Sequence, residues 1–265
     1  MKLYLSRWVC QDVESNVTRF ETEARRAVDA GAEIVVFPEL FLTGYTRSLD
    51  LADTRARFAR ISAGAPGALF VFGSISEDRR NRVTVWCGGE QIACYDKVHL
   101  FRPNGELDLW DRGDRYVAFR WHGLTIGLVN CNDLRFPEQA RALALEARCD
   151  VLVVPAWWPW RRDWVWRTLL RARAIENGVW VLGCCIAGSV FAGEDFAGAG
   201  NHVFDPLGEA VRTEDDLTYD LGFERRPDLV VNPREEALEI SILEVLSEGD
   251  REWPKRSGKL AGDDD

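Results

Sequence analysis

The sequence lacks the patterns that mark membrane-spanning and secreted proteins. No segment approaches the roughly 18 consecutive apolar residues that a membrane-spanning helix needs. The apolar run in residues 1–8 is short and is interrupted by charge, unlike the core of a signal peptide. The chain has seven cysteines, an odd number, and none of them form a Cys-x-x-Cys pair, which argues against a disulfide framework and a structural zinc site. We therefore expect a cytoplasmic protein.

Positive charge is also in short supply. The chain has 33 Lys and Arg residues against 43 Asp and Glu residues, so its net charge is −10. This excess of negative charge argues against binding to the phosphate backbone of nucleic acid and to an anionic membrane surface. Part of the excess lies in residues 257–265, which we expect to form an acidic, disordered tail.

What the sequence does contain is a series of short apolar strands that alternate with helical segments. Short, continuously apolar strands between helices are typical of parallel strands that are buried on both faces. Two predicted hairpins, with Gly88-Gly89 and His122-Gly123 as turns, add antiparallel strands. No linker divides the chain, so we predict one α/β domain in which two mixed sheets pack face to face under outer helices. The predicted strands span 3–9, 33–37, 68–74, 82–88, 91–96, 116–121, 124–130, 151–155, 179–186, 201–204, 209–212 and 236–243, and the predicted helices span 14–30, 51–62, 137–147 and 163–177.

The segment 124–138 carries the strongest local signal for chemistry. It predicts a buried strand that ends at Cys131, then a polar turn, then a helix that begins at Pro137. A cysteine at such a strand-to-helix turn projects from the end of the sheet beside free backbone N–H groups. An exposed nucleophile with oxyanion donors next to it has this arrangement. The alternative interpretation is a small buried core cysteine.

Two other strands end at reactive side chains. Glu39 follows the strand at 33–37, and Lys97 follows the strand at 91–96. Ligand sites in α/β proteins gather at the carboxyl ends of strands, so these groups could meet Cys131 there. Glu39 could take the thiol proton, and Lys97 could lower the pKa of the thiol and stabilise an oxyanion. Taken singly, each would be an ordinary solvated charge.

Three motifs in this order and at these spacings resemble the Glu-Lys-Cys signature of the carbon–nitrogen hydrolase (nitrilase) superfamily. They lie at 37–40, 96–101 and 131–138, with later landmarks at 171–177, 205–208 and 251–254. The resemblance implies a four-layer α/β/β/α sandwich over residues 1–256, assembled as a homodimer or larger homo-oligomer. It implies hydrolysis of a non-peptide C–N bond through a thioester, with no metal or cofactor. By position, Glu39 is the general base, Lys97 the oxyanion-stabilising cation and Cys131 the nucleophile.

The resemblance also implies residues that contact the substrate. Glu106 lies where many members carry a further glutamate that orients the lysine or the substrate. The backbone N–H of Asn132 would be a second oxyanion donor, although many members have an aromatic residue at this position. Trp157 and Trp158 follow the strand at 151–155, where members place substrate-facing residues. They either line the acyl pocket or pack against the outer helix.

Within the superfamily, the compact segment 97–102 followed by Glu106 most resembles the ω-amidase-like branch. That branch hydrolyses the terminal amide of α-keto acid amides and releases ammonia. An N-carbamoyl hydrolase or a nitrilase would use the same three residues, so both remain open. A substrate carboxylate would need a cation, and the candidates are Arg135, Arg161 and Arg162.

Two alternative functions lie outside the carbon–nitrogen hydrolase activities. A cysteine–histidine hydrolase would need a histidine beside Cys131, and the chain has only His99, His122 and His202, none of them in a peptidase motif. A catalytically degenerate member of the superfamily would bind a small molecule without turning it over. The presence of all three motif side chains argues against that reading.

Overall fold

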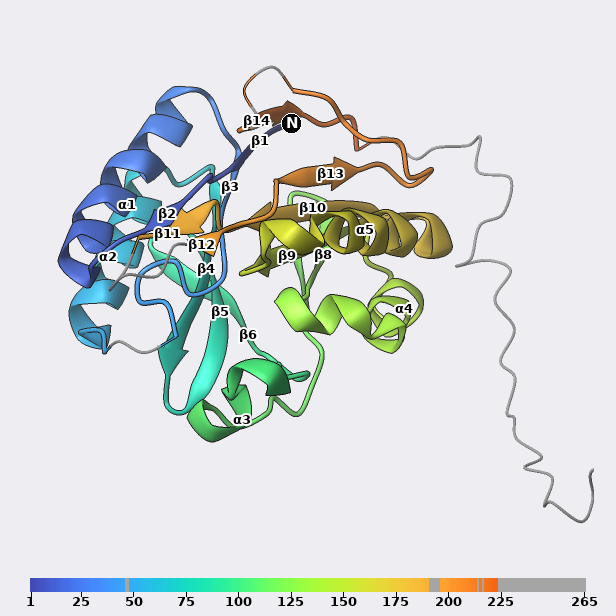
Figure 1. The fold of residues 1–265 in the computed structure, drawn as a ribbon. Helices are drawn as coiled ribbons and strands as arrows, with labels where there is room; N and C mark the ends of the chain where they lie inside the picture. Colours follow the sequence, from blue (N-terminus) through green and yellow to red (C-terminus); the bar gives the residue numbers. More distant parts are fainter. Residues whose placement is uncertain (46–47, 191–195, 214, 216, 224–265) are drawn as a thin grey trace, which may run out of the picture.

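The architecture consists of two large sheets and a small one, with helices on the outside (Figure 1). The computed structural model describes residues 1–45, 48–190, 196–213, 215 and 217–223. The predicted strand at 236–243, the landmark at 251–254, the end of the predicted domain at 256 and the acidic tail all lie outside the described residues. Along the chain the elements are β1 (Lys2–Leu5), β2 (Val9–Cys10), α1 (Val13–Asp29), β3 (Ile34–Phe37), α2 (Leu51–Gly64), β4 (Leu69–Glu77), β5 (Arg80–Cys87), β6 (Glu90–Asp96), α3 (Glu106–Leu109), β7 (Ala118–Trp121), β8 (Leu124–Leu128), α4 (Pro137–Leu145), β9 (Val151–Ala156), α5 (Asp163–Asn177), β10 (Trp180–Cys185), β11 (Gly188–Ser189), β12 (Phe196–Ala197), β13 (His202–Phe204) and β14 (Thr218–Asp220).

Both large sheets mix parallel and antiparallel strands. The first has the order β14-β1-β3-β4-β5-β6 and the second the order β13-β10-β9-β8-β7. In each sheet the central strands run parallel, namely β1, β3 and β4 in one and β8, β9 and β10 in the other. The remaining pairs are antiparallel, and a small sheet of β12, β11 and β2 lies to the side. The predicted pair of mixed sheets is thus confirmed.

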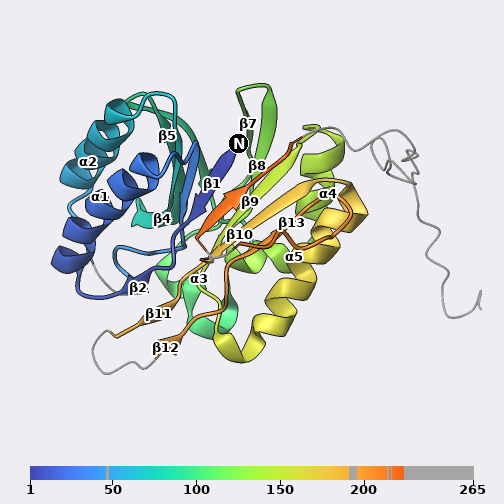
Figure 2. The same cartoon turned by 90° about the horizontal axis from the view of Figure 1, so that it is seen from above.

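The two large sheets face each other, and helices cover their outer faces (Figure 2). Side chains alternate along each strand, so one set points between the sheets and the other set points toward a helix layer. Between the sheets, Val36 and Val71 from one side meet Val153 and Leu182 from the other in a single apolar cluster. This arrangement is the four-layer α/β/β/α sandwich, with α1 and α2 on one side and α4 and α5 on the other.

The helices begin and end where the sequence pattern indicates. Asp12 caps α1 by accepting a hydrogen bond from the Ser15 amide at 2.8 Å. Pro137 is the first residue of α4, where its missing N–H costs nothing. Gly178 ends α5 in the left-handed conformation. No helix in the described part of the chain is both long and apolar enough to cross a membrane.

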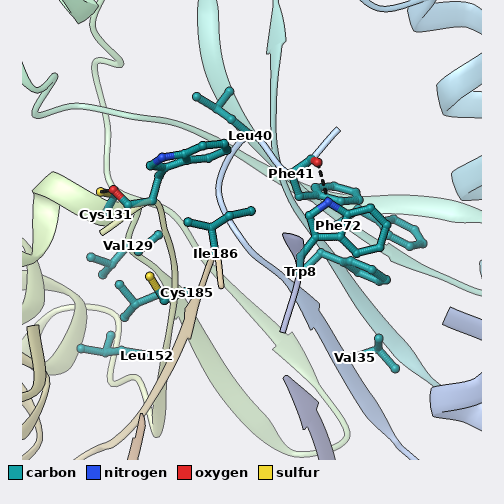
Figure 3. Packing of buried hydrophobic residues seen from close by; sticks show 14 of the residues in the cluster. Trp8, Val35, Leu40, Phe41, Phe72, Val129, Cys131, Leu152, Cys185 and Ile186 are labelled. Carbon is teal, nitrogen blue, oxygen red and sulfur yellow. Dashed lines mark hydrogen bonds between the residues drawn. The ribbon is translucent and has the colours of Figure 1, made fainter. Parts of the chain in front are cut away.

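Two predicted strands are wrong in detail. The strand expected at 3–9 is split into β1 and β2, because the Trp8 side chain turns into the core between the rings of Phe37 and Phe41. There its Nε1 donates to the carbonyl of Phe41 at 2.7 Å (Figure 3). The strand expected at 209–212 is not regular: it pairs with the segment around β13 through an isolated bridge between Phe204 and Ala210 and a hydrogen bond from the Val211 amide to the Val203 carbonyl at 2.9 Å.

Candidate active site

The three candidate catalytic side chains come from both large sheets. Glu39 lies two residues after β3 and Lys97 directly follows β6, so both belong to the six-stranded sheet. Cys131 lies three residues after β8 in the five-stranded sheet. The site therefore lies where the two packed sheets meet, and neither sheet alone contains it.

A strained turn holds Glu39 in place. The residue after it, Leu40, has a left-handed φ of 49°, which a leucine rarely adopts. Its amide donates to the Ser74 hydroxyl at 3.1 Å. The neighbouring strand β4 bulges between Val71 and Ser74, and Gly73 there approaches the turn so closely that an added Cβ would lie 1.9 Å from the Pro38 carbonyl oxygen. The turn and the bulge thus fit together as one unit.

A second strained turn carries the cysteine. Cys131 has a left-handed φ of 50° and begins a short 3-10 helix over Cys131–Arg135. At the start of this helix the backbone amide of Asn130 donates to the Asp133 carboxylate at 3.0 Å. Asp133 also accepts from the hydroxyl of Tyr95 at 2.7 Å and from the backbone amide of His99 at 2.8 Å. The Asp133 carboxylate therefore links the cysteine turn to the segment that carries Lys97.

Lys97 lies between two carboxylates in the interior. Its Nζ donates to Oε1 of Glu39 at 2.7 Å and to Oε1 of Glu106 at 3.0 Å, and all three side chains are fully buried. Burial alone would lower the pKa of Lys97, but the negative charges around it outweigh burial and raise that pKa. Lys97 is therefore a permanent cation at neutral pH.

Other groups hold the two carboxylates in position. Asn81 donates from Nδ2 to Oε1 of Glu39 at 2.9 Å, and the backbone amide of Trp157 donates to Oε2 of Glu39 at 2.9 Å. Glu106 accepts from the backbone amide of Phe101 at 2.8 Å and from the Tyr45 hydroxyl at 3.3 Å. Burial is the main cause that raises the pKa of Glu106. With this many donors, the Glu39 carboxylate has little rotational freedom.

The Cys131 thiol differs from the expected exposed nucleophile. The residue is only 6% exposed, and its Sγ lies 3.8 Å from the carbonyl oxygen of Trp157. Burial raises the pKa of Cys131 well above its ordinary value, and the nearby Glu39 charge raises it further. Lys97 lowers this pKa as expected, but its effect is outweighed. The resting thiol is therefore protonated, and it needs a base to become a nucleophile.

The Cys131 side chain lines a small cavity that is open to solvent. Asn132 lines it, although its side-chain amide is occupied by the backbone carbonyls of His99 at 3.0 Å and Leu100 at 3.4 Å. Trp157 and Trp158 both line the cavity. Trp158 also packs against Trp166 of α5 at a ring-centroid distance of 5.4 Å, so it has both of the roles considered above: it lines the pocket and it packs against the outer helix. The residues around the cavity are Phe101, Cys131, Asn132, Arg135, Trp157, Trp158, Pro159 and Arg162.

Several predicted candidates lie away from this cavity. Glu106 is buried behind Lys97 and not among the lining residues, so it contacts the lysine rather than the cavity. The imidazole of His99 pairs with Asp133 at 2.9 Å, and that of His202 pairs with Asp163 at 3.0 Å. No histidine side chain in the described part of the chain lines the cavity, which argues against a cysteine–histidine hydrolase.

Two residues of the site were missed by sequence reasoning. Asn81 lies at the start of β5 and bridges Glu39 to the Nδ2 of Asn130, which donates to Asn81 Oδ1 at 3.1 Å. Tyr45 contacts Glu106 from the segment after Glu39. Asn81 directly precedes the strand predicted at 82–88, and nothing else in the sequence indicated it. Among the described residues, no group of three His, Cys, Asp or Glu side chains could hold a metal ion.

Sequence comparison assigns the class of protein. The profile of the carbon-nitrogen hydrolase family matches residues 5–219, and the chain belongs to this family. It is similar to the omega-amidase YafV of Escherichia coli strain K12, with 31% identity over 215 residues that cover 78% of this chain and 81% of the relative. It is also similar to a 2-oxoglutaramate amidase of Bacillus subtilis strain 168, with 34% identity over 191 residues that cover 68% of this chain and 73% of the relative.

Solved structures agree with this assignment. The NitN amidase of Nesterenkonia sp. AN1 superposes with a TM-score of 0.72 at 27% identity, covering 83% of this chain and 92% of that chain. A variant of the Nesterenkonia amidase carries the acetamide moiety of fluoroacetamide covalently added at its active-site cysteine. It superposes with a TM-score of 0.75 at 25% identity and covers 84% of this chain and 90% of that chain. The present chain is accordingly a carbon–nitrogen hydrolase of the amidase type.

Proposed function

We propose that this enzyme hydrolyses the terminal amide of a short α-keto acid amide through a thioester on Cys131 and releases ammonia. The observation that carries the proposal is the buried Lys97 cation held between Glu39 and Glu106 beside a protonated thiol that opens into a cavity. Glu39 is the general base, Lys97 the cation that stabilises the oxyanion and Cys131 the nucleophile. The names of the relatives, omega-amidase and 2-oxoglutaramate amidase, support the choice of substrate.

The first half of the reaction forms the thioester. Glu39 takes the thiol proton of Cys131 as the sulfur attacks the amide carbon, and the carbonyl oxygen becomes an oxyanion. Lys97 and the backbone N–H of Asn132 stabilise this oxyanion. Glu39 then passes its proton to the nitrogen, the C–N bond breaks and ammonia leaves. Because Glu39 and Glu106 hold the Nζ of Lys97 by hydrogen bonds of 2.7 and 3.0 Å, its positive charge is already in position when the oxyanion forms.

The second half regenerates the enzyme. Glu39 takes a proton from water, and the resulting hydroxide attacks the thioester carbon. The C–S bond breaks, the carboxylic acid leaves, and the cysteine sulfur recovers the proton that Glu39 held. Each cycle therefore consumes one water molecule and returns Glu39 and Cys131 to their starting protonation states.

The test is to incubate the protein with 2-oxoglutaramate and measure ammonia. We expect ammonia release, a hydroxamate when hydroxylamine is added to intercept the thioester, and an acyl adduct on the Cys131 peptide by mass spectrometry. Cys131→Ala should lower turnover by about 10³-fold or more. Full activity in Lys97→Ala would contradict the assigned role of the lysine.

Two related substrates serve as alternatives in the same assay. An N-carbamoyl amino acid and a short nitrile are both attacked at carbon by a cysteine with the same neighbours, so Glu39, Lys97 and Cys131 do not separate them from amides. Faster turnover of either would overturn the amide assignment but keep the thioester chemistry. No product from any substrate, together with no alkylation of Cys131 by iodoacetamide, would indicate a binding protein.

A further inference from the structure

The side-chain amide of Asn81 has a hydrogen bond at each end, and one of them reaches the proposed general base. Asn81 is the second residue of β5 and is fully buried. Its Nδ2 donates to Oε1 of Glu39 at 2.9 Å, and its Oδ1 accepts from Nδ2 of Asn130 at 3.1 Å. A flipped amide would set its oxygen against the carboxylate and its NH₂ against another donor, so only one orientation fits. Asn81 therefore presents an N–H to Glu39 in a fixed direction.

The two asparagines connect the six-stranded sheet to the turn that carries the nucleophile. Asn81 belongs to β5, whereas Asn130 follows β8 of the five-stranded sheet and immediately precedes Cys131. Asn130 is also fully buried, and its backbone amide donates to the Asp133 carboxylate at 3.0 Å. A path of two hydrogen bonds thus runs from Glu39 to the residue beside Cys131. Because water does not compete for these buried bonds, the path fixes the base relative to the sulfur.

The donors around Glu39 are divided unequally between its two oxygens. Oε1 accepts from Nζ of Lys97 at 2.7 Å as well as from Asn81, and a carboxylate oxygen has only about two lone-pair sites, so Oε1 is filled. Oε2 accepts from the backbone amide of Trp157 at 2.9 Å and keeps its second site for a proton. The Sγ of Cys131 lies 3.8 Å from the carbonyl oxygen of the same Trp157. Oε2 and the sulfur therefore lie against one residue.

We propose that Asn81 is a positioning residue: it fills the second site of Oε1, so that Oε2 of Glu39 exchanges protons with Cys131, and through Asn130 it holds the base in register with the sulfur. The inference rests on the proposed function, because it takes Glu39 as the general base. Without Asn81, Oε1 would compete for the proton, and a proton held there beside Lys97 is misplaced for transfer to the leaving nitrogen. Asn81 is not among the residues that line the cavity, so it acts on the reaction through Glu39.

Asn81→Ala tests this role by kinetics. It should lower kcat for 2-oxoglutaramate by about 10- to 100-fold and leave KM within about twofold, because the base is misplaced while the substrate cavity is unchanged. The acid limb of the pH profile should move up by about 0.5 to 1 pH unit, because losing a donor favours the protonated carboxylate. Asn81 itself does not titrate. The titratable side chains around the base are those of Tyr45, Lys97, Glu106 and Cys131.

Asn130→Ala tests the path without altering Asn81. It removes the donor that fixes the Asn81 amide, so the amide can flip and turn its oxygen toward Glu39. We expect the same signature in a weaker form, with kcat lower by about 3- to 30-fold and KM nearly unchanged. If the two asparagines act through one path, the double variant loses little more than Asn81→Ala alone. Losses that multiply in the double variant would overturn the shared path.

Asn177→Ala is the matched control for a buried asparagine. Asn177 is fully buried in α5, and its Nδ2 donates to the carbonyl of Arg173 at 2.9 Å. Its loss should lower the urea midpoint but leave kcat and the acid limb of the pH profile at their wild-type values, measured where each variant is fully folded. An Asn81→Ala variant that behaves like Asn177→Ala would show a structural role only and would overturn the proposal.

A crystal structure of Asn81→Ala separates this inference from the proposed function, because it requires no turnover. We expect the Glu39 carboxylate to rotate from its wild-type orientation once Oε1 has lost one of its two donors. A carboxylate that keeps Lys97 on Oε1 and the Trp157 amide on Oε2, as in the wild type, would overturn the positioning role. If the wild type instead hydrolyses an N-carbamoyl amino acid or a nitrile, only the substrate assignment fails, and the same kcat ratios are measured on that substrate.

Discussion

At the scale of single residues, the site combines a cysteine that is hard to ionise with a base beside it. Many reactive cysteines are activated by a lowered pKa. Here burial and the Glu39 charge raise the pKa of Cys131, and the attractive effect of Lys97 does not compensate. A protonated thiol reacts slowly with other electrophiles, and in the proposed mechanism Glu39 removes its proton when an amide is in place.

This arrangement predicts that Glu39→Gln makes the Cys131 thiol easier to ionise and alkylate but slows turnover. Losing a negative charge beside the sulfur lowers the pKa of Cys131, so the pH midpoint for its alkylation by iodoacetamide should fall. Ammonia release should fall by about 10²- to 10⁴-fold, because the general base is lost. Both are measured on the same protein, with alkylation followed at the Cys131 peptide by mass spectrometry.

Cys94 provides an internal control for this experiment, because it is an exposed free cysteine, whereas Cys131 is buried. Its alkylation should have the same pH profile in the wild type and in Glu39→Gln. An alkylation midpoint for Cys131 that rises or stays unchanged in the variant would show that Glu39 does not raise the pKa of the thiol.

At the scale of secondary-structure elements, the close fit of the Glu39 turn against β4 makes its own prediction. Gly73 has a φ of +47°, and a Cβ there would lie 1.9 Å from the Pro38 carbonyl oxygen. Gly73→Ala should therefore lower the free energy of unfolding by about 2–5 kcal/mol through backbone strain and overpacking. It should also reduce turnover per folded molecule, because relief of the clash displaces the turn that carries Glu39. Urea denaturation and an ammonia assay at low temperature measure the two effects.

Gly67→Ala is the control for that substitution. Gly67 has no atom within 4 Å of its added Cβ and lies outside the left-handed region. Its free energy of unfolding should stay within about 0.5 kcal/mol of the wild type. If Gly73→Ala were as stable and as active as Gly67→Ala, the bulge would have no part in positioning Glu39.

Also at the scale of elements, the sequence was sufficient to predict some site residues and strands but not others. Glu39, Lys97 and Cys131 each lie in a short motif at a strand end, so local pattern was sufficient to identify them as candidates. Asn81 was missed because its contact with Glu39 joins residues 42 positions apart, and no local pattern encodes it. The strand predicted at 3–9 failed for a similar reason, since the long-range hydrogen bond from Trp8 to Phe41 overrides strand propensity.

At the scale of the whole molecule, the site exists only if the two sheets are packed in one arrangement. Glu39 and Lys97 come from one sheet and Cys131 from the other. Hydrophobic patterning predicted two sheets with outer helices, and this was confirmed. The relative position of the two sheets could not be predicted from the sequence, because it depends on how side chains such as Leu182 and Val71 interdigitate between the sheets.

Leu182→Ala tests this dependence of the site on sheet packing. Leu182 is fully buried in the cluster between the sheets and lies in β10, which contributes no catalytic side chain. The cavity left behind should lower the free energy of unfolding by about 2–5 kcal/mol. If the sheets shift to fill it, a misplacement on the order of 1 Å between Glu39 and Cys131 should lower kcat by up to about 100-fold.

Ile92→Ala on the exposed side of β6 is the control. It should leave kcat unchanged and the free energy of unfolding within about 0.5 kcal/mol of the wild type, since Ile92 is 41% exposed. Urea midpoints at one protein concentration and kcat under conditions where each variant is fully folded separate the two effects. A destabilised Leu182→Ala with wild-type kcat would show that the active site tolerates a loosened interface between the sheets.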